Sequence, residues 1–269
     1  MPPLNRKALV SIVIPVYNEE MNVRNALLRV KEVFTPLADQ YDFECVFTDN
    51  HSTDRTFDIL KEMAAEDPRV RAYRFSRNFG YQKSILAAYS LARGDCAVQL
   101  DCDLQDPPEL ISQFLAFWRE GYKVVYGIRR TRQESPHIEW MRKGFYRLID
   151  ALSEDHLPHD AGDFRLVDRR VLDELVKIKD YHIYIRGRLA VMGFSQIGIP
   201  YDRAQRLLGE SKFRLKHMVN LAVDALLSHS VAPLRLATWC GLAATLAAIG
   251  LAGGYFIMYA CFGQEWPAG

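Results

Sequence analysis

Cysteine is scarce in this sequence, and the few cysteines follow no recognisable pattern. Five occur among 269 residues, and no two of them stand at the C-x-x-C spacing of zinc sites and redox enzymes. They are Cys45, Cys96, Cys102, Cys240 and Cys261. This scatter argues against a zinc site and a disulfide framework, so we expect reduced thiols that face the cytosol or are buried.

Net charge is also nearly absent. Lysine and arginine together number 34 against 33 aspartates and glutamates, which leaves a net charge of +1. Such a balance produces no overall field that would attract nucleic acid, so we expect no nucleic-acid partner. Any basic binding site must therefore be local.

The N-terminus lacks an apolar leader, and the chain contains no internal repeat or low-complexity stretch. Met1–Lys7 is short and polar, and the apolar run Ala8–Val16 is interrupted by Pro15. This run predicts a buried strand that enters a loop, and it does not resemble a secretory signal.

Charged residues are missing altogether from Leu236–Phe262, which is longer than the roughly 20 apolar residues that cross a bilayer. We predict a transmembrane helix at 235–263. Basic residues precede the uncharged run and only Glu265 follows it; the basic residues are Lys212, Arg214, Lys216 and Arg235. The positive-inside rule therefore predicts a cytoplasmic N-terminal domain at the inner (cytoplasmic) membrane.

The transmembrane segment divides the chain into a domain at 1–211, a juxtamembrane amphipathic helix at 212–234, the span itself and a short tail at 264–269. A second amphipathic segment, His137–Leu152, lies inside the first domain. Its apolar residues recur at helical spacing, which suits a helix packed on a sheet as well as one on the membrane surface.

Strand-like and helix-like segments alternate through the first half of the chain. The predicted strands are Leu9–Ile14, Phe43–Thr48, Val70–Phe75, Cys96–Leu100 and Lys123–Tyr126. The predicted helices are Glu20–Phe34, Arg55–Ala65, Gln82–Ala92 and Glu109–Arg119. This order predicts an α/β fold with a mostly parallel central sheet, whose ligands bind in the loops beyond the carboxyl ends of the strands.

The most informative of these loops contains Asp101 and Asp103, which follow a buried strand. Residues two apart on a strand point to the same side, so both carboxylates can bind one Mg²⁺ or Mn²⁺ ion, with Gln105 as a neutral ligand. A diphosphate would supply further ligand oxygens. Asp106 precedes Pro107 and is explained structurally as the cap of the next helix.

Two earlier loops are candidates for binding a nucleotide. Asp49 directly follows the second strand and is placed to accept hydrogen bonds from a base or ribose. The Pro15–Glu19 loop occupies the equivalent place after the first strand, although Glu19 could equally be an acid in the first turn of a helix.

Basic residues gather in three other loops, and they suit either a solvated surface or a clamp for phosphates. They are Arg77 and Lys83; Arg129, Arg130 and Arg132; and Arg203, Arg206 and Lys212.

Taken together, these motifs resemble glycosyltransferase family 2, and specifically its polyprenyl-phosphate branch of bactoprenol glucosyltransferases and dolichyl-phosphate mannose synthases. The matching stretches are SIVIPVYNEE at 11–20, FTDNHSTDRT at 47–56, FSRNFGYQKS at 75–84, LDCDLQDPPEL at 100–110, GDFRLVDRRV at 162–171, YIRGRLAVMGF at 184–194 and RAQRLLGESKFRLKHM at 203–218. The resemblance implies a GT-A-type nucleotide-binding domain followed by membrane-associated helices. The chain departs from the pattern in DNHSTD for the commoner DDGSTD, in Cys102 and in having one membrane helix where the bacterial branch typically has two.

The resemblance also implies roles for individual residues. Metal and donor diphosphate would be held by Asp101, Asp103 and Gln105, and the nucleotide by Pro15, Tyr17, Glu19, Asp49, Lys83 and Asp101. The acceptor phosphate would be contacted by Arg129, Arg203, Arg206, Ser211 and Lys212. Catalysis would depend most on Asp103, Asp163 and Arg206.

The implied reaction is an inverting transfer of a hexose, by best resemblance glucose from UDP-glucose, to undecaprenyl or another polyprenyl phosphate. A phosphate monoester with a second pKa of about 6 is already largely a dianion at pH 7 and needs no strong base. Asp163 is therefore predicted to orient groups or hold Arg165 in place.

Three other functions fit parts of the sequence. A processive polysaccharide synthase of the same fold is faintly indicated at 203–207, but Leu207 replaces the tryptophan of its (Q/R)xxRW element. A soluble nucleotidyltransferase leaves the apolar segment unexplained, and a non-catalytic sugar-nucleotide-binding membrane protein would not need the intact acids. Gly250 and Gly254 stand at GxxxG spacing, which allows a homo-oligomer formed through the span.

Overall fold

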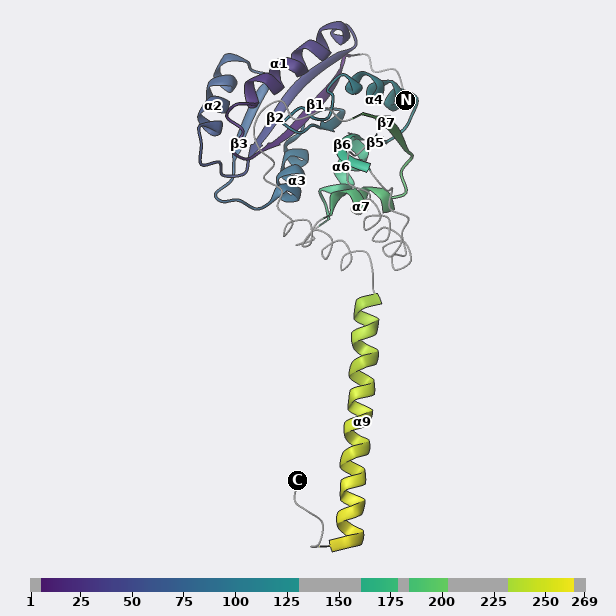
Figure 1. Ribbon diagram of the computed structural model, residues 1–269. Helices are drawn as coiled ribbons and strands as arrows, with labels where there is room; N and C mark the ends of the chain where they lie inside the picture. The colour runs from purple at the N-terminus through teal and green to yellow at the C-terminus, as the bar shows by residue number, and fades with distance from the viewer. Residues whose placement is uncertain (1–5, 131–160, 179–183, 203–231, 264–269) are drawn as a thin grey trace.

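The computed structural model describes residues 6–130, 161–178, 184–202 and 232–263, and Figure 1 shows their arrangement. Within these ranges, seven strands form one sheet in the order β3-β2-β1-β4-β6-β5-β7. The strands are β1 (Ala8–Val16), β2 (Tyr41–Asp49), β3 (Val70–Arg74), β4 (Cys96–Gln99), β5 (Val124–Arg129), β6 (Ala161–Asp168) and β7 (Gln196–Tyr201). The helices are α1 (Val23–Phe34), the 3₁₀ helix η1 (Thr35–Leu37), α2 (Thr56–Glu66), α3 (Tyr81–Leu91), α4 (Leu110–Arg119), α6 (Arg169–Leu175), α7 (Ile185–Val191) and α9 (Ala232–Phe262).

The sheet is parallel except at β6. Strands β1, β2, β3 and β4 run in one direction, and β5 runs parallel to β7, whereas β6 lies antiparallel between β4 and β5. The start of β6 therefore lies at the same edge as the ends of β4 and β5. Gln99 pairs with Arg165, which brings the residues before Arg165 beside those that follow Gln99.

Two hydrophobic layers cover the two faces of the sheet. One contains Ile12 and Ile14 of β1 with apolar side chains of α1, α2 and α4, and the other contains Val13 with side chains of α3, α6 and α7. Neighbouring residues of β1 thus point into opposite layers, and all three are fully buried. Burial on both faces is why this strand is an apolar run without alternation.

The predicted α/β fold with a mostly parallel sheet is confirmed. The five predicted strands correspond to β1 to β5, and the four predicted helices to α1 to α4, with ends that differ by a few residues. Two strands, β6 and β7, had no predicted counterpart. They complete the sheet and bring the second half of the chain to the carboxyl edge.

The helix α9 contains a candidate membrane span, Ala237–Phe262, of 26 residues with a mean hydropathy of 1.7. None of this stretch is buried, and large apolar side chains such as Leu251 and Phe256 are exposed. Figure 1 shows α9 as one long helix. Length and composition therefore suit a bilayer as its surroundings. The predicted amphipathic helices at 137–152 and 213–230 lie outside the described residues.

Candidate functional site

The loops that follow β1 and β2 are bound to each other by hydrogen bonds. The backbone N–H of Asn18 donates to Ser52 Oγ at 2.8 Å, and the backbone N–H of Thr53 donates to Asn18 Oδ1 at 2.7 Å. Asn50 extends the connection to the loop after β3, because its side chain donates to Asn78 Oδ1 and accepts from the backbone N–H of Phe79, both at 2.9 Å. The three loops therefore form one surface at the carboxyl edge.

Backbone strain is concentrated at this edge. Among the described residues, the non-glycine residues with positive φ are Asn18 at 54°, His51 at 64° and Leu104 at 54°. They lie in the loops after β1, β2 and β4, and left-handed backbone at side-chain-bearing residues clusters at functional sites. His51 takes such a conformation at the position where the resemblance leads one to expect glycine.

Asp49 ends β2 and is completely buried. Its Oδ1 accepts hydrogen bonds from the backbone and hydroxyl of Ser52, and Arg74 Nε lies 3.4 Å from its Oδ2. That second oxygen has no hydrogen-bond partner. A buried carboxylate oxygen without a donor is costly, so it is suited to receive one from a ligand.

The other predicted nucleotide-binding residues surround the same loops. Pro15 is buried in β1, and Tyr17 is 38% exposed directly after it. Glu19 lies four residues before α1 begins at Val23 and accepts a hydrogen bond of 2.6 Å from the side chain of Asn22. Glu19 is therefore not a first-turn acid of that helix. Lys83 lies half-buried in the first turn of α3.

Asp101 follows β4 and is held by two neutral donors. Its Oδ1 accepts from the hydroxyl of Tyr81 at 2.5 Å and from Gln99 Nε2 at 2.9 Å. Burial, together with the negative charges of Asp106 and Asp103, raises the pKa of the Asp101 carboxyl to about 7, against the hydrogen bond from Tyr81. Asp101 thus stands in a field that disfavours its own negative charge.

Asp103 lies two residues further on, in the loop that leads to α4. Its Oδ1 accepts from the backbone N–H of Gln105 at 3.2 Å, and the side chains of both residues are half-buried. The loop therefore keeps Asp103 and Gln105 in the same short turn after Asp101.

The prediction that Asp106 caps the next helix is wrong. Helix α4 begins at Leu110, and its cap residue is Glu109. The buried carboxylate of Asp106 instead accepts from the Tyr201 hydroxyl at 2.5 Å and pairs with Arg129 at 3.2 Å. Asp106 therefore ties the loop after β4 to the ends of β5 and β7, and Arg129, the predicted acceptor contact, is held by it.

Asp163 is brought to this edge by the reversed strand β6. Arg186 at the start of α7 binds it with two hydrogen bonds, Nε to Oδ1 at 2.7 Å and Nη2 to Oδ2 at 2.6 Å. Burial alone would raise the pKa of Asp163, but the charge and hydrogen bonds of Arg186 keep it below its ordinary value. Asp163 is thus an ionised, oriented carboxylate.

The expected partner of Asp163, Arg165, makes a different contact. Its guanidinium donates to the backbone carbonyl of Gly162 at 2.6 Å, and Arg165 is 4% exposed. Asp163 therefore makes its hydrogen bonds with Arg186, and Arg165 acts on it only through its positive charge, which helps to lower the pKa of Asp163. Arg186, Tyr81 and Tyr201 were missed by the sequence analysis, because arginine and tyrosine outside a charged loop carry no signal there.

Asp101 and Asp103 offer carboxylate oxygens, which are the ligand atoms that Mg²⁺ and Mn²⁺ prefer. Within the described ranges, no three His, Cys, Asp or Glu side chains are grouped to hold a metal by themselves. Asp106 and Asp163 are each paired with an arginine, whereas the donors to Asp101 are neutral. A cation at Asp101 and Asp103 would relieve their repulsion and would take its other ligands from a bound diphosphate or water.

Four predicted acceptor-phosphate residues, Arg203, Arg206, Ser211 and Lys212, lie outside the described residues.

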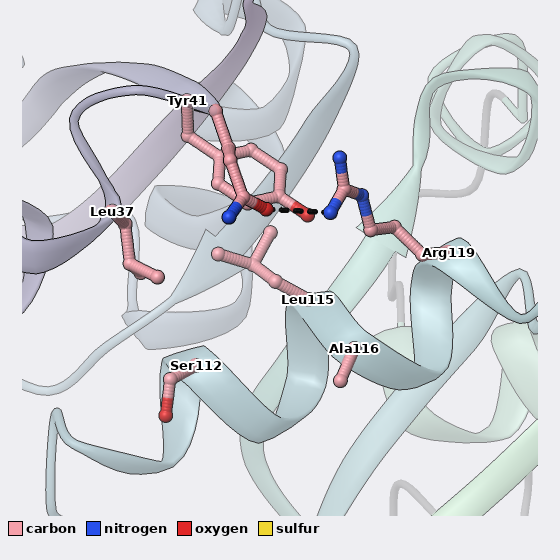
Figure 2. A pocket seen from close by; sticks show the side chains of 7 residues that line it. Leu37, Tyr41, Ser112, Leu115, Ala116 and Arg119 are labelled. Carbon is pink, nitrogen blue, oxygen red and sulfur yellow. Dashed lines mark hydrogen bonds between the residues drawn. The ribbon is translucent and has the colours of Figure 1, made fainter. Parts of the chain in front are cut away.

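A pocket away from this site has no acidic residue in its lining. It lies between α4 and the start of β2, where the Arg119 guanidinium is 5.3 Å from the ring centre of Tyr41 and donates to Gln40 (Figure 2). Tyr41 begins β2 and Asp49 ends it, so this pocket lies at the other edge of the sheet.

The fold and the site define an α/β protein whose polar and charged side chains gather at the carboxyl edge of its sheet, where proteins of this architecture bind their ligands. Residues 11–176 match the family described as "Glycosyl transferase family 2". The glycosyltransferase YkcC of Bacillus subtilis is 41% identical over 240 residues, with 89% of this chain and 74% of the relative covered. The bactoprenol glucosyl transferase of Shigella phage SfV is 34% identical, with 87% and 76% covered. The chain belongs to glycosyl transferase family 2 and is a glycosyltransferase.

Solved structures of low sequence identity share the fold. The mannosyltransferase PcManGT of Pyrobaculum calidifontis, in complex with GDP-Man and Mn²⁺, has a TM-score of 0.51 at 18% identity, with 96% of this chain and 84% of that chain covered. Glucosyl-3-phosphoglycerate synthase of Mycobacterium tuberculosis, in complex with Mn²⁺, UDP-Glc and glycerol 3-phosphate, has a TM-score of 0.53 at 21% identity, with 82% and 79% covered.

Proposed function

We propose that this glycosyltransferase moves a hexose, with glucose from UDP-glucose as the best candidate, to the phosphate of a polyprenyl phosphate such as undecaprenyl phosphate. The relatives named bactoprenol glucosyl transferase support this acceptor and this sugar, at 33% to 34% identity over most of the chain. Mn²⁺ in the complexes of two enzymes with this fold supports the use of Mg²⁺ or Mn²⁺.

One observation carries the proposal. Asp101, with neutral donors, and Asp163, with a bidentate arginine, stand at the same edge of the sheet although they come from different strands. A cation and the donor diphosphate would bind at Asp101, and the acceptor phosphate would bind near Asp163. Donor and acceptor would then lie next to each other. Such positioning is a major part of the catalysis of group transfer between charged reactants.

The reaction is a single displacement at the anomeric carbon. An oxygen of the acceptor phosphate forms a bond to that carbon, while the bond from the carbon to the donor β-phosphate oxygen breaks. The electron pair of the broken bond leaves with the nucleoside diphosphate, and the configuration at the anomeric carbon inverts. A bound divalent cation neutralises the charge that develops on the departing diphosphate.

Asp163 orients the acceptor side and does not act as a base. Both of its oxygens already accept hydrogen bonds from Arg186, and its lowered pKa makes it a poor proton acceptor. The phosphate acceptor is largely a dianion at neutral pH and has little need of proton removal. Asp163 thus keeps the Arg186 guanidinium fixed at the edge where the acceptor phosphate would arrive.

On the donor side, the base or ribose would donate to Asp49 Oδ2, which accepts no hydrogen bond in the structure and lies 3.4 Å from Arg74 Nε. Pro15, Tyr17 and Glu19 would line the pocket. Lys83 would contact the diphosphate from the first turn of α3. On the acceptor side, Arg129, which is held by Asp106, would act with Arg203, Arg206, Ser211 and Lys212 on the lipid phosphate.

We place α9 across the inner (cytoplasmic) membrane, with the α/β domain on the cytoplasmic face. Ala237–Phe262 has the length and hydropathy of a span, and basic residues at 212–216 would meet the anionic headgroups. This arrangement would hold the active site within reach of a lipid phosphate.

The test is an assay of sugar transfer to lipid. Full-length protein in detergent is incubated with radiolabelled UDP-glucose and undecaprenyl phosphate, and radioactivity is counted in the organic extract. UDP-galactose, a UDP-N-acetylhexosamine and GDP-mannose are tested in parallel. Label in the lipid fraction that depends on undecaprenyl phosphate supports the proposal. Transfer to a polysaccharide would instead indicate a polysaccharide synthase. Nucleotide binding without turnover of any donor would indicate a non-catalytic sugar-nucleotide-binding protein.

Arg206→Ala is expected to raise the KM for undecaprenyl phosphate by about ten- to a hundredfold while the KM for UDP-glucose changes little. Loss of a charge-assisted hydrogen bond to phosphate costs roughly 1.5–3 kcal/mol. Steady-state kinetics with each substrate varied in turn measures the effect. Arg24→Ala, in an exposed ion pair with Glu62, is the control and should change neither value. Equal increases in the KM for UDP-glucose and for undecaprenyl phosphate would show that Arg206 does not act on the acceptor phosphate in particular.

The double variant Gly250→Leu, Gly254→Leu is expected to shift a homo-oligomer toward monomer without loss of transferase activity. Glycine carries no Cβ, so two helices that cross at these positions of α9 can bring their backbones close together. Light scattering in mild detergent measures the state. A monomeric wild type, or a variant that is equally oligomeric, would end the idea of assembly through the span.

A further inference from the structure

Tyr81 is the first residue of α3, and its partly buried ring packs against the hydrophobic core. Gly80 adopts a φ of 91°, which lets the chain turn sharply into the helix at this residue. The ring packs against the layer that contains Val13, Ile85 and Tyr89. An anchored aromatic ring has few rotamers, so the position of its hydroxyl is well determined.

The hydroxyl of Tyr81 is directed at the metal-binding loop. It donates to Asp101 Oδ1 at 2.5 Å and accepts from Gln99 Nε2 at 3.1 Å, while the same Nε2 donates to Asp101 Oδ1 at 2.9 Å. Gln99 is fully buried in β4. The three side chains form a closed triangle in which one oxygen of Asp101 is held from both a helix and a strand.

The start of α3 is itself held from the acceptor side. The Gln82 side chain accepts a hydrogen bond of 3.2 Å from the backbone N–H of Ile185, the neighbour of Arg186. Tyr81 therefore stands on a turn that is connected to both sides of the site, and movement of its hydroxyl is restricted further.

We propose that Tyr81 is a positioning residue that acts through Asp101: its hydroxyl holds Oδ1 and leaves the other carboxylate oxygen for a divalent cation. This inference rests on the proposed role of Asp101 as a metal ligand. Residues that orient metal ligands through hydrogen bonds typically contribute 10- to 100-fold to metal affinity. Tyr81 itself touches neither cation nor sugar in this proposal.

The test is the affinity for Mn²⁺, measured without turnover. Full-length protein in detergent with UDP is titrated with Mn²⁺, free Mn²⁺ is followed by electron paramagnetic resonance, and binding to UDP alone is subtracted. Tyr81→Phe removes one oxygen and keeps the ring. We expect its Kd for Mn²⁺ to rise by about tenfold, and its turnover to recover at saturating Mn²⁺.

The matched control is Tyr89→Phe, which removes a buried hydroxyl from the same helix. That hydroxyl has no hydrogen-bond partner, so its loss should leave the Kd for Mn²⁺ unchanged. Gln99→Leu removes the other donor to Asp101, and the double variant with Tyr81→Phe should weaken Mn²⁺ binding by less than the product of the two single effects.

The outcomes separate the inference from the function on which it rests. If the wild type binds Mn²⁺ and the Kd of Tyr81→Phe lies within twofold of the wild-type Kd, the role of Tyr81 is overturned and the metal site stands. A loss of turnover in Tyr81→Phe that saturating Mn²⁺ does not restore also overturns it. A wild type that binds no Mn²⁺ overturns both the metal site and the inference.

Discussion

Asp103→Asn is expected to lower the rate of sugar transfer by at least about a hundredfold while the fold is retained. The asparagine keeps the shape of the side chain and removes its negative charge, so the proposed cation loses one of two carboxylate ligands. Metal stabilisation of a departing diphosphate contributes several kcal/mol, and a loss of about 3 kcal/mol corresponds to about a hundredfold in rate. Initial rates of label transfer from UDP-glucose to lipid measure the effect.

The control is Glu109→Gln in the same loop. Glu109 lies at the surface in an exposed ion pair with Arg29, so this variant loses the same charge outside the site and should keep the wild-type rate. EDTA should silence the wild type, and Mg²⁺ or Mn²⁺ should restore it. Full activity in EDTA, or an Asp103→Asn enzyme near the wild-type rate, would reject the metal role of this loop.

Arg186→Ala is expected to lower the free energy of unfolding by about 3 kcal/mol at neutral pH, because it leaves the buried carboxylate of Asp163 without its partner. In the wild type, the lowered pKa of Asp163 means that the pair stabilises the fold above the ordinary aspartate pKa of about 3.9 and that this contribution disappears as pH falls. In Arg186→Ala, burial without the arginine raises the pKa of Asp163, so the unpaired carboxylate takes up a proton as pH falls and the difference between variant and wild type should shrink toward pH 4.

Denaturant unfolding at pH 7 and near pH 4 measures this difference. Lys177→Ala breaks the exposed ion pair with Glu174 and serves as the control, with an expected change below about 1 kcal/mol at either pH. Asp163→Asn should lose the pH dependence, because the amide does not titrate. A destabilisation by Arg186→Ala that is as large at pH 4 as at pH 7 would show that lost packing, and not the uncompensated charge, is responsible.

Much of the fold was predictable because its first half is built from local patterns. A strand buried on both faces must be apolar throughout, as in β1, and a helix on the sheet must repeat its apolar residues at helical spacing, as in α4 with Ile111, Phe114, Leu115 and Trp118. The strands β6 and β7 were missed. Arg165 in β6 is buried and charged, so the segment does not read as a core strand.

The site was predictable where adjacent residues share one loop. Asp101 and Asp103 follow an apolar strand, and their place beyond its carboxyl end follows from the direction of the chain. The role of Asp106 was predicted wrongly. A proline after it suggests a helix cap, and only the approach of β5 and β7 supplies the arginine and tyrosine that bind it.

By itself, the sequence determined the α/β class, the loops with the chemistry and the apolar segment near the C-terminus, because each of these depends on residues close together along the chain. The tertiary structure alone decided that Asp163 stands beside Asp101. It also decided that Arg186 binds Asp163 and that Tyr81 binds Asp101. The physical reason is the reversed direction of β6, which puts its first residues at the edge where its neighbours end. Strand direction is set by packing and hydrogen bonds between distant segments, which a local pattern does not encode.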